Sequence, residues 1–357
     1  MTQPQRILIV RLSHLGDVVH ALPVFHALRE AYPAAEFGWA IQPEFSGLVE
    51  GLPGLERIFH FGRQQGLSAW FKLRRELLDW RPDLAVDCQG NLKSAVVTRL
   101  SGARRRAGYH RYDWREQAGA RILTETSQRV TTNPIHALDR TTQLVQHFVP
   151  KAELRTDPAL TETELETGRA SWREHGGTAG ALLIHLSTQS DVRSWPTSSA
   201  ANLAQAAAAK GRSVIILSGP AEREEGQKLA SELSGTERVH HWVGQDGLRD
   251  LAGIFHAAAE DDSQLVGCDS GPMHLAVACN LAVLCLEGPQ DANRTGPRQL
   301  AHLARPSETR VMRATEQLEC APCLKRRCGH AEGPVCMTRI LPEQVLQALE
   351  ETTLATN

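Results

Sequence analysis

The chain has 357 residues, more than a single hydrophobic core usually supports, so two domains are expected. Its hydrophobic content of 41% and charged content of 22% are typical of a soluble globular enzyme and argue against a disordered or fibrous protein. No apolar run approaches the ~18 residues of a membrane-spanning helix, and residues 1–6 show no signal-peptide pattern. We therefore expect a cytoplasmic chain whose eight cysteines stay reduced.

The first predicted strand, residues 6–10, leads into a turn and then a helix. The strand is almost wholly apolar, as in a buried parallel sheet. A turn follows at residues 13–16, and a helix restarts at Asp17, a common N-cap residue, and runs to residue 32. Open α/β sheets build their sites at such strand ends. Two interpretations stay open: Asp17 belongs to a site, or it only caps its helix.

The rest of the N-terminal half alternates strands with helices. Strands are predicted at residues 36–41, 55–61, 83–87 and 106–109, and helices at 68–80, 92–100 and 135–148. A Pro/Gly-rich loop separates the first two of these strands. The helix at 68–80 carries Trp70, Leu73, Leu77 and Trp80 on one face, which suits a core, although a basic helix with tryptophans can also lie on a membrane. The alternation predicts a doubly wound parallel sheet.

A polar linker with two prolines, residues 149–158, precedes a second series of alternating elements. Strands are predicted at 181–186, 213–217, 239–243, 264–267 and 281–286, with helices between them. We expect domains at residues 1–150 and 151–310, and a Cys-rich tail with a C-terminal helix at 311–357. Two similar halves predict a cleft with one substrate on each half.

The turn at residues 268–274 joins a predicted strand to a helix. Asp269 or Ser270 can cap this helix, and Gly271 allows the backbone to approach a ligand. Free N–H groups at the helix start suit a diphosphate, and Ser187, Thr188 and Arg193 follow another strand end and could clamp the same group. A plainly capped helix is the alternative. The chain has neither G-x-G-x-x-G after its first strand nor a P-loop, so dehydrogenase and P-loop interpretations are weak.

Charge is distributed unevenly along the chain. Residues 1–150 contain 19 Lys and Arg against 14 Asp and Glu, and the remainder contains 20 against 27. The stretch 93–121 contains eight basic residues and two acidic ones. This excess suits an anionic partner, although most of these arginines could equally form solvated surface.

Four motifs together carry a resemblance to a known family. Residues 12–23 (LSHLGDVVHALP), 87–94 (DCQGNLKS), 268–274 (CDSGPMH) and 288–291 (GPQD) resemble glycosyltransferase family 9, the lipopolysaccharide heptosyltransferases, and residues 115–117 resemble the heptosyltransferase I branch. Two features depart from the family's pattern: Arg193 stands where a lysine is usual, and Gln290 lies in a stretch usually written GPTDP.

The resemblance implies a GT-B architecture with two Rossmann-like domains and an inverting, metal-independent transfer of heptose from ADP-heptose. Asp17 would be the general base that removes the acceptor hydroxyl proton. The acceptor would be an anionic Kdo/heptose-bearing glycolipid at the inner membrane surface, contacted by His14, Lys93 and Arg115. The resemblance implies no nucleic-acid partner. Donor binding would fall to eight residues of the second domain: Ser187, Thr188, Arg193, Glu222, Asp269, Ser270, Gly271 and His274.

Other functions stay open at this point. A family 9 enzyme could use another sugar nucleotide or a protein acceptor. A nucleotide-sugar epimerase of the same architecture would need no acceptor domain, so the basic stretch 93–121 counts against it. The non-enzymatic alternative is an inactive binding or assembly protein that is stabilised by a bound metal, and the presence of Asp17 counts against it.

The tail contains four closely spaced cysteines. Cys320, Cys323, Cys328 and Cys336 follow the spacing C-x2-C-x4-C-x7-C. Four sulfurs in a cytoplasmic chain suggest a structural Zn or Fe site, with no role in catalysis. Reduced thiols or a disulfide framework are the alternatives, and some relatives within the family carry a similar cluster.

Overall fold

The computed structural model describes residues 3–62, 66–188, 191–244, 247–298, 308–316 and 318–355, without the side chains of 352–355. The chain divides into two compact units, unit 1 (Met1–Ala159) and unit 2 (Leu160–Asn357). This division lies nine residues after the predicted one, and the Cys-rich tail is part of unit 2 rather than a separate region. No described helix is long and apolar enough to cross a bilayer.

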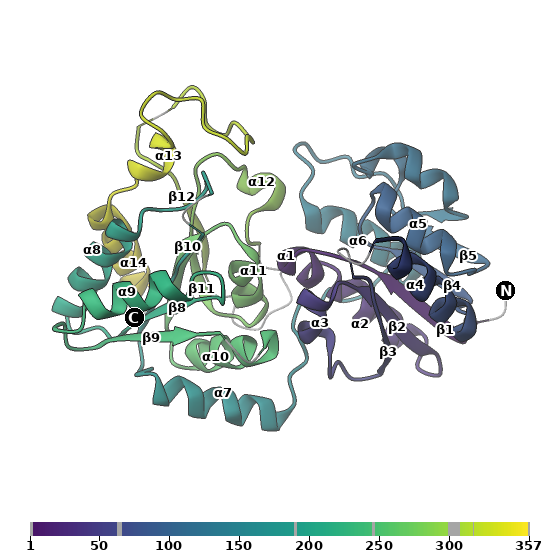
Figure 1. The fold of residues 1–357 in the computed structure, drawn as a ribbon, viewed down its shortest axis with the longest axis horizontal. Coiled ribbons are helices and arrows are strands. Elements are labelled where there is room, and N and C mark those ends of the chain that lie inside the picture. The colour runs from purple at the N-terminus through teal and green to yellow at the C-terminus, as the bar shows by residue number, and fades with distance from the viewer. Residues whose placement is uncertain are drawn as a thin grey trace. The chain divides into compact units, whose positions relative to one another are not determined.

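Unit 1 is built on a six-stranded parallel sheet in the order β3-β2-β1-β4-β5-β6 (Figure 1). The strands are β1 (Arg6–Val10), β2 (Glu36–Ile41), β3 (Leu55–His60), β4 (Leu84–Asp87), β5 (Arg105–Gly108) and β6 (Glu125–Thr126). The helices are α1 (Leu15–Val19), α2 (Leu22–Ala31), α3 (Pro43–Val49), α4 (Gly66–Trp80), α5 (Leu92–Leu100) and α6 (Ala137–Phe148). Two short 3-10 helices, η2 (Arg111–Asp113) and η3 (Gln117–Ile122), follow β5.

Unit 2 repeats this plan with the strand order β12-β11-β10-β7-β8-β9, again all parallel. The strands are β7 (Leu182–His185), β8 (Val214–Ser218), β9 (Val239–Val243), β10 (Gln264–Cys268), β11 (Ala282–Leu286) and β12 (Thr309–Met312). The helices are α7 (Glu162–Glu174), α8 (Thr197–Ala209), α9 (Arg223–Glu232), α10 (Leu248–Glu260), α11 (Gly271–Ala278), α12 (Ala292–Thr295), α13 (Val335–Thr338) and α14 (Pro342–Ala355). The predicted pair of doubly wound parallel sheets is therefore confirmed.

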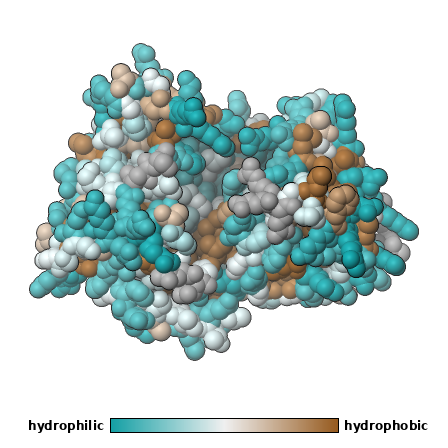
Figure 2. Space-filling view, in the orientation of Figure 1, coloured by the Kyte–Doolittle hydropathy of each residue, from teal (hydrophilic) through white to brown (hydrophobic). Residues whose placement is uncertain are grey.

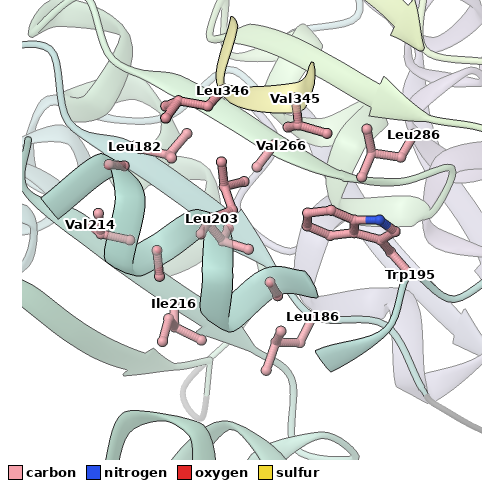
Figure 3. Close-up of a cluster of buried hydrophobic side chains, with 14 of the residues drawn as sticks. Leu182, Leu186, Trp195, Leu203, Val214, Ile216, Val266, Leu286, Val345 and Leu346 are labelled. Atoms are coloured by element: carbon pink, nitrogen blue, oxygen red, sulfur yellow. The ribbon is translucent and has the colours of Figure 1, made fainter. Parts of the chain in front are cut away.

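One face of the unit 2 sheet is covered by α8 and the C-terminal helix α14. Leu203 of α8 and Val345 of α14 pack with Leu182 and Val266 of the sheet, all fully buried (Figure 3). The indole of Trp195 lies at the end of this cluster and donates to the Ile340 carbonyl at 2.9 Å. Because burial of each such side chain contributes about 1.5–3 kcal/mol, the tail is an integral part of the core.

Strand order reverses at one point in each sheet. In unit 1 the reversal lies between β1 and β4, and in unit 2 between β10 and β7. The chains leaving the carboxyl ends of two such neighbouring strands diverge to opposite faces and leave room for a ligand. The loops after β1, β4, β7 and β10 are therefore the expected site-forming segments.

Several local expectations were wrong. The first helix begins at Leu15 after the N-cap His14, so Asp17 lies within the first turn and does not cap it. The predicted single helix to residue 32 is broken into α1 and α2 just before Pro23. Helix α3 occupies part of the expected loop, one turn of helix (α12) interrupts the loop after β11, and β12 was not predicted.

Candidate functional site

Asp17 is held by an arginine from the end of β1. Its carboxylate forms an ion pair with Arg11, whose side chain is only 10% exposed while that of Asp17 is 41% exposed. Arg11 also donates to the carbonyl of Cys88, which follows β4. A buried guanidinium thus presents a half-exposed carboxylate at the strand ends where the sheet order reverses. The alternative in which Asp17 only caps its helix is excluded, because the N-cap is His14.

The turn after β4 is fixed by a buried carboxylate. Asp87 accepts the backbone N–H groups of Gln89 and Gly90, both at 2.9 Å, and burial raises the pKa of its carboxyl. The Gln89 amide oxygen in turn accepts the N–H of Leu12 at 2.8 Å. The loops after β1 and β4 are therefore tied to each other, which sets the position of the segment that contains Asp17.

The three residues predicted to contact the acceptor also lie near this end of the sheet. His14 has a left-handed backbone (φ 65°) and an exposed imidazole whose edge contacts Phe45. Lys93 lies in the first turn of α5, and Arg115 donates its backbone N–H to Gly90 at 3.0 Å. The neighbouring Glu116 carboxylate accepts the N–H of Leu92, which holds the 115–116 segment at the start of α5. The segments that carry Lys93 and Arg115 are thus joined.

In unit 2, the loop after β7 brings three of the predicted donor-binding residues together. Thr188 is hydrogen-bonded to the carboxylate of Glu222, the N-cap residue of α9. Arg193 forms a two-point ion pair with Asp191, and this guanidinium holds the pKa of the Asp191 carboxyl below its usual range. The charge of Arg193 is therefore already balanced by its neighbour, a pairing that sequence reasoning did not predict.

The turn after β10 is stabilised by the hydrogen bonds of a buried aspartate. Asp269, 7% exposed, lies 3.2 Å from the Nε2 atom of His274 and accepts from the amide of Gln290 at 2.7 Å. Ser270 is the N-cap residue of α11 without a side-chain cap, and its buried hydroxyl has no protein hydrogen-bond partner among the described residues. Gly271 begins the helix. Asp269 and His274 therefore hold the turn, whereas Ser270 and the start of α11 are the groups left to meet a ligand.

The loop after β11 is anchored on a second buried carboxylate. Glu287 pairs with Arg313 at 2.7 Å, and burial raises the pKa of the Glu287 carboxyl. Thr295 at the end of α12 approaches Asp269 at 3.3 Å. The 287–297 loop is thus tied to the turn after β10 on one side and to β12 on the other.

The four tail cysteines line one small cavity together with Pro289 and Val192. The Sγ atom of Cys328 accepts the backbone N–H of His330 at 3.4 Å and lies 3.1 Å from the Gly333 carbonyl. Within the described ranges, no group of three or more His, Cys, Asp or Glu side chains is arranged to hold a metal ion. The structure gathers the thiols but does not show a coordination site.

Sequence reasoning missed the residues that orient the site: Arg11, Asp87, Gln89, Asp191 and Gln290. Two of them carried a signal, because Arg11 and Asp87 are charged residues beside a buried strand end, where an unpaired charge is costly. Gln89 and Gln290 lie within two of the family-like motifs, which did not indicate their partners, and Asp191 lies in a polar loop without any such signal.

Comparisons with known proteins agree on one family. The family model described as "Glycosyltransferase family 9 (heptosyltransferase)" matches residues 70–332. The lipopolysaccharide heptosyltransferase 1 of Pseudomonas aeruginosa is 29% identical over 98% of this chain and 98% of its own length. A family 9 glycosyltransferase structure from Veillonella parvula superposes with a TM-score of 0.76 at 20% identity, covering 98% of this chain and 97% of that one. E. coli heptosyltransferase WaaC with ADP gives a TM-score of 0.69 at 22% identity, covering 98% of each chain.

Proposed function

Because the chain belongs to glycosyltransferase family 9, we propose that this glycosyltransferase moves a heptose from ADP-heptose to a lipopolysaccharide core acceptor. The observation that carries the proposal is the family match, supported by the near full-length similarity to a heptosyltransferase 1. The similarity to a structure that was solved with ADP supports an adenine nucleotide as the donor's leaving group.

Unit 2 supplies the donor site in this proposal. The hydroxyls of Ser187 and Ser270, the first N–H groups of α11 and the Arg193 guanidinium surround the ends of β7 and β10. Hydrogen-bond donors held in place by a folded loop stabilise the charge that builds on a leaving diphosphate, without a catalytic metal or cofactor. Thr188, Glu222, Asp269 and His274 act as supports in this scheme, because their side chains already bond within the loops.

Unit 1 supplies the acceptor site and the base. Asp17 accepts the proton of the attacking hydroxyl as the sugar centre becomes oxocarbenium-like, and the configuration at that carbon inverts. The Arg11 guanidinium pairs with the Asp17 carboxylate and orients it. Lys93, Arg115 and His14 bind the anionic groups of the glycolipid.

We further propose that unit 1 contacts the cytoplasmic face of the inner membrane through α4 and α5. The apolar face predicted for α4 is buried in the core, with Trp70 half-buried, so the contact uses the opposite side. There Leu67 and Phe71 are 77% and 71% exposed, and Leu92 and Val96 are exposed on α5, a helix that contacts α4. Figure 2 shows apolar side chains gathered over these two helices. Four basic side chains lie on the same two helices. Lys72 and Arg75 are paired with Glu76 and Asp79, so Arg74 and Arg99 are the cations best suited to anionic headgroups.

Vesicle co-sedimentation tests this surface. A Leu67→Ser, Phe71→Ser variant should lose binding to vesicles that contain phosphatidylglycerol. A Leu341→Ser variant, which changes an exposed leucine of unit 2, should retain it. Equal binding by the unmodified chain and by both variants would refute the membrane contact.

The Cys cluster is proposed as a structural metal site. The gathering of Cys320, Cys323, Cys328 and Cys336 around one cavity supports it, since four thiolates suit Zn²⁺ or iron. Elemental analysis of the purified chain should find about one equivalent of metal, and less in Cys323→Ser. A metal-free, fully folded chain with four titratable thiols in this segment would reject the site.

A nucleotide panel tests the main proposal. ADP, UDP, GDP and CMP are added at matched concentrations, and the apparent stability of the chain is measured. A ligand at about 100 times its Kd should stabilise the native state by about 2.7 kcal/mol. We expect ADP to be preferred, and ADP-heptose to give a heptosylated Kdo-bearing lipid acceptor detectable by mass spectrometry. Preference for UDP or GDP would indicate another sugar donor. Transfer of the sugar to a protein would indicate another acceptor. No stabilisation by any of the four nucleotides would indicate an inactive scaffold.

A further inference from the structure

The Cys-rich segment lies against two loops of unit 2, the loop after β7 that carries Arg193 and the loop after β11. The backbone N–H of Leu324 donates to the Pro289 carbonyl at 2.7 Å, which joins the segment to the loop after β11. Val192, between Asp191 and Arg193, lines the same small cavity as the cysteines, Lys325 and Arg327. In Figure 1 the segment between β12 and α13 extends toward α12. Residues far apart in the chain thus meet beside the loops that follow β7 and β11.

This segment contains three consecutive cations, Lys325, Arg326 and Arg327, and all three are exposed. None of the three forms an ion pair with a described residue. Arg326 is close enough to act electrostatically on Asp191, because its charge helps to lower the pKa of that carboxyl after the larger effect of Arg193. The three charges therefore add a positive field beside the loop that carries Arg193.

Arg193, the cation proposed for the loop after β7, supplies little positive field by itself. Arg193 is paired with Asp191, so the two together contribute little net charge toward an anion. Glu222 is another carboxylate of the same region, hydrogen-bonded to Thr188. A leaving diphosphate gains negative charge during transfer, and cations held nearby in a folded segment are the usual means of stabilising it.

We infer that residues 325–327 of the Cys-rich segment bind the diphosphate of the sugar nucleotide, in addition to the groups at the ends of β7 and β10. The inference rests on the proposed function and identifies a phosphate-binding element outside the four family-like motifs. The Leu324–Pro289 hydrogen bond ties this segment to the loop after β11, and the cavity that its cysteines share with Val192 places it beside the loop that carries Arg193.

The test compares a ligand with phosphates and one without. Calorimetric titrations with ADP and with adenosine are made on the unmodified chain, on Arg326→Gln and on a triple variant with Gln at 325–327. The triple variant should bind ADP at least tenfold more weakly, with a shallower dependence on salt, and bind adenosine as before. Arg326→Gln alone should weaken ADP binding about threefold. Because the three side chains are exposed, the substitutions leave the core of unit 2 intact.

A matched control removes the same net charge elsewhere in unit 2. Arg173, Lys228 and Arg238 are exposed and lie on α7, on α9 and just before β9, so their replacement by Gln should leave ADP affinity within twofold. The inference is overturned if the 325–327 variant binds ADP as the unmodified chain does, or if adenosine binding falls in parallel. Absence of ADP binding by the unmodified chain would overturn the proposed function as well.

Discussion

Replacement of Asp17 by Asn separates catalysis from folding and from donor binding. The substitution keeps the size of the side chain and removes its ability to accept a proton. Loss of a general base typically costs 10²–10⁴-fold in rate, equivalent to about 3–5 kcal/mol of activation free energy. We expect this loss in kcat, with ADP affinity unchanged, because the proposed donor residues all belong to unit 2.

The expected effect on stability is much smaller. Asp17 is 41% exposed, so solvent screens its pair with Arg11, and the guanidinium keeps its bond to the Cys88 carbonyl. A screened pair of this kind contributes about 1 kcal/mol. Against the roughly 5–15 kcal/mol of a native domain, that loss leaves nearly every molecule folded. Unfolding therefore cannot account for a rate loss of 10²-fold or more.

The assay measures ADP released from ADP-heptose in the presence of a Kdo-bearing acceptor, together with calorimetric ADP binding. Glu36→Gln is the matched control, because it also removes a half-exposed carboxylate paired with an arginine of β1, Arg6, at 3.1 Å. The control should keep full activity. Turnover of Asp17→Asn within threefold of the unmodified chain would refute the role of Asp17, as would a parallel loss of ADP affinity.

Three further predictions follow from other contacts. Arg249 is the main cause that lowers the pKa of Glu164 to about 2, from about 4.5 in the unfolded chain. The ionised Glu164 therefore stabilises unit 2 fully at pH values above about 4.5, and this contribution is lost as the pH falls toward 2. Glu164→Gln should therefore lower the urea-unfolding free energy by about 1–2 kcal/mol at pH 7, allowing for solvent screening, and the deficit should shrink steadily below pH 4.5. Gly168→Ala should cost about 1–3 kcal/mol in the same assay, because a Cβ would lie 2.4 Å from the backbone of α10, whereas Gly235→Ala, with open space around it, should be near neutral. Lys93→Ala should raise the acceptor KM several-fold in initial-rate measurements and leave ADP binding unchanged, and equal KM values would exclude Lys93 from the acceptor site.

The fold was largely predictable because most strands of both sheets are continuous apolar runs. β8 is buried throughout and β1 is buried after Arg6, so their sequences alone identify them. β12 escaped prediction because it is an edge strand of four residues, with Arg310 and the 41%-exposed Val311 in it, so it lacks that pattern. Helix α3 contains Gly47 and was taken for a loop, although Pro43 at its first position is a recognised start signal.

The sequence identifies candidate residues for the site but not the contacts between them. Arg11 and Asp17 are six residues apart, and the turn between them contains His14 with a left-handed backbone at φ 65°, which the sequence does not indicate. Asp269 and Gln290 come from loops after different strands and meet only because β10 and β11 are neighbours. Spacing in a sequence carries no information about such partners, since the assembled sheet determines them.

The same electrostatic arrangement occurs at the reversal point of each sheet. In unit 1 an aspartate balances Arg11, and in unit 2 an aspartate balances Arg193. A paired arginine keeps its geometry when no ligand is bound and avoids the cost of an unpaired charge at a partly buried position. An anion that binds such an arginine must, however, share the guanidinium with the aspartate or displace it. The pair therefore adds less to the affinity for the anion than an unpaired arginine would. Cations that form no ion pair with a described residue, as at 325–327, should then determine the salt dependence of ADP binding, whereas Arg193 should determine how the phosphates are oriented.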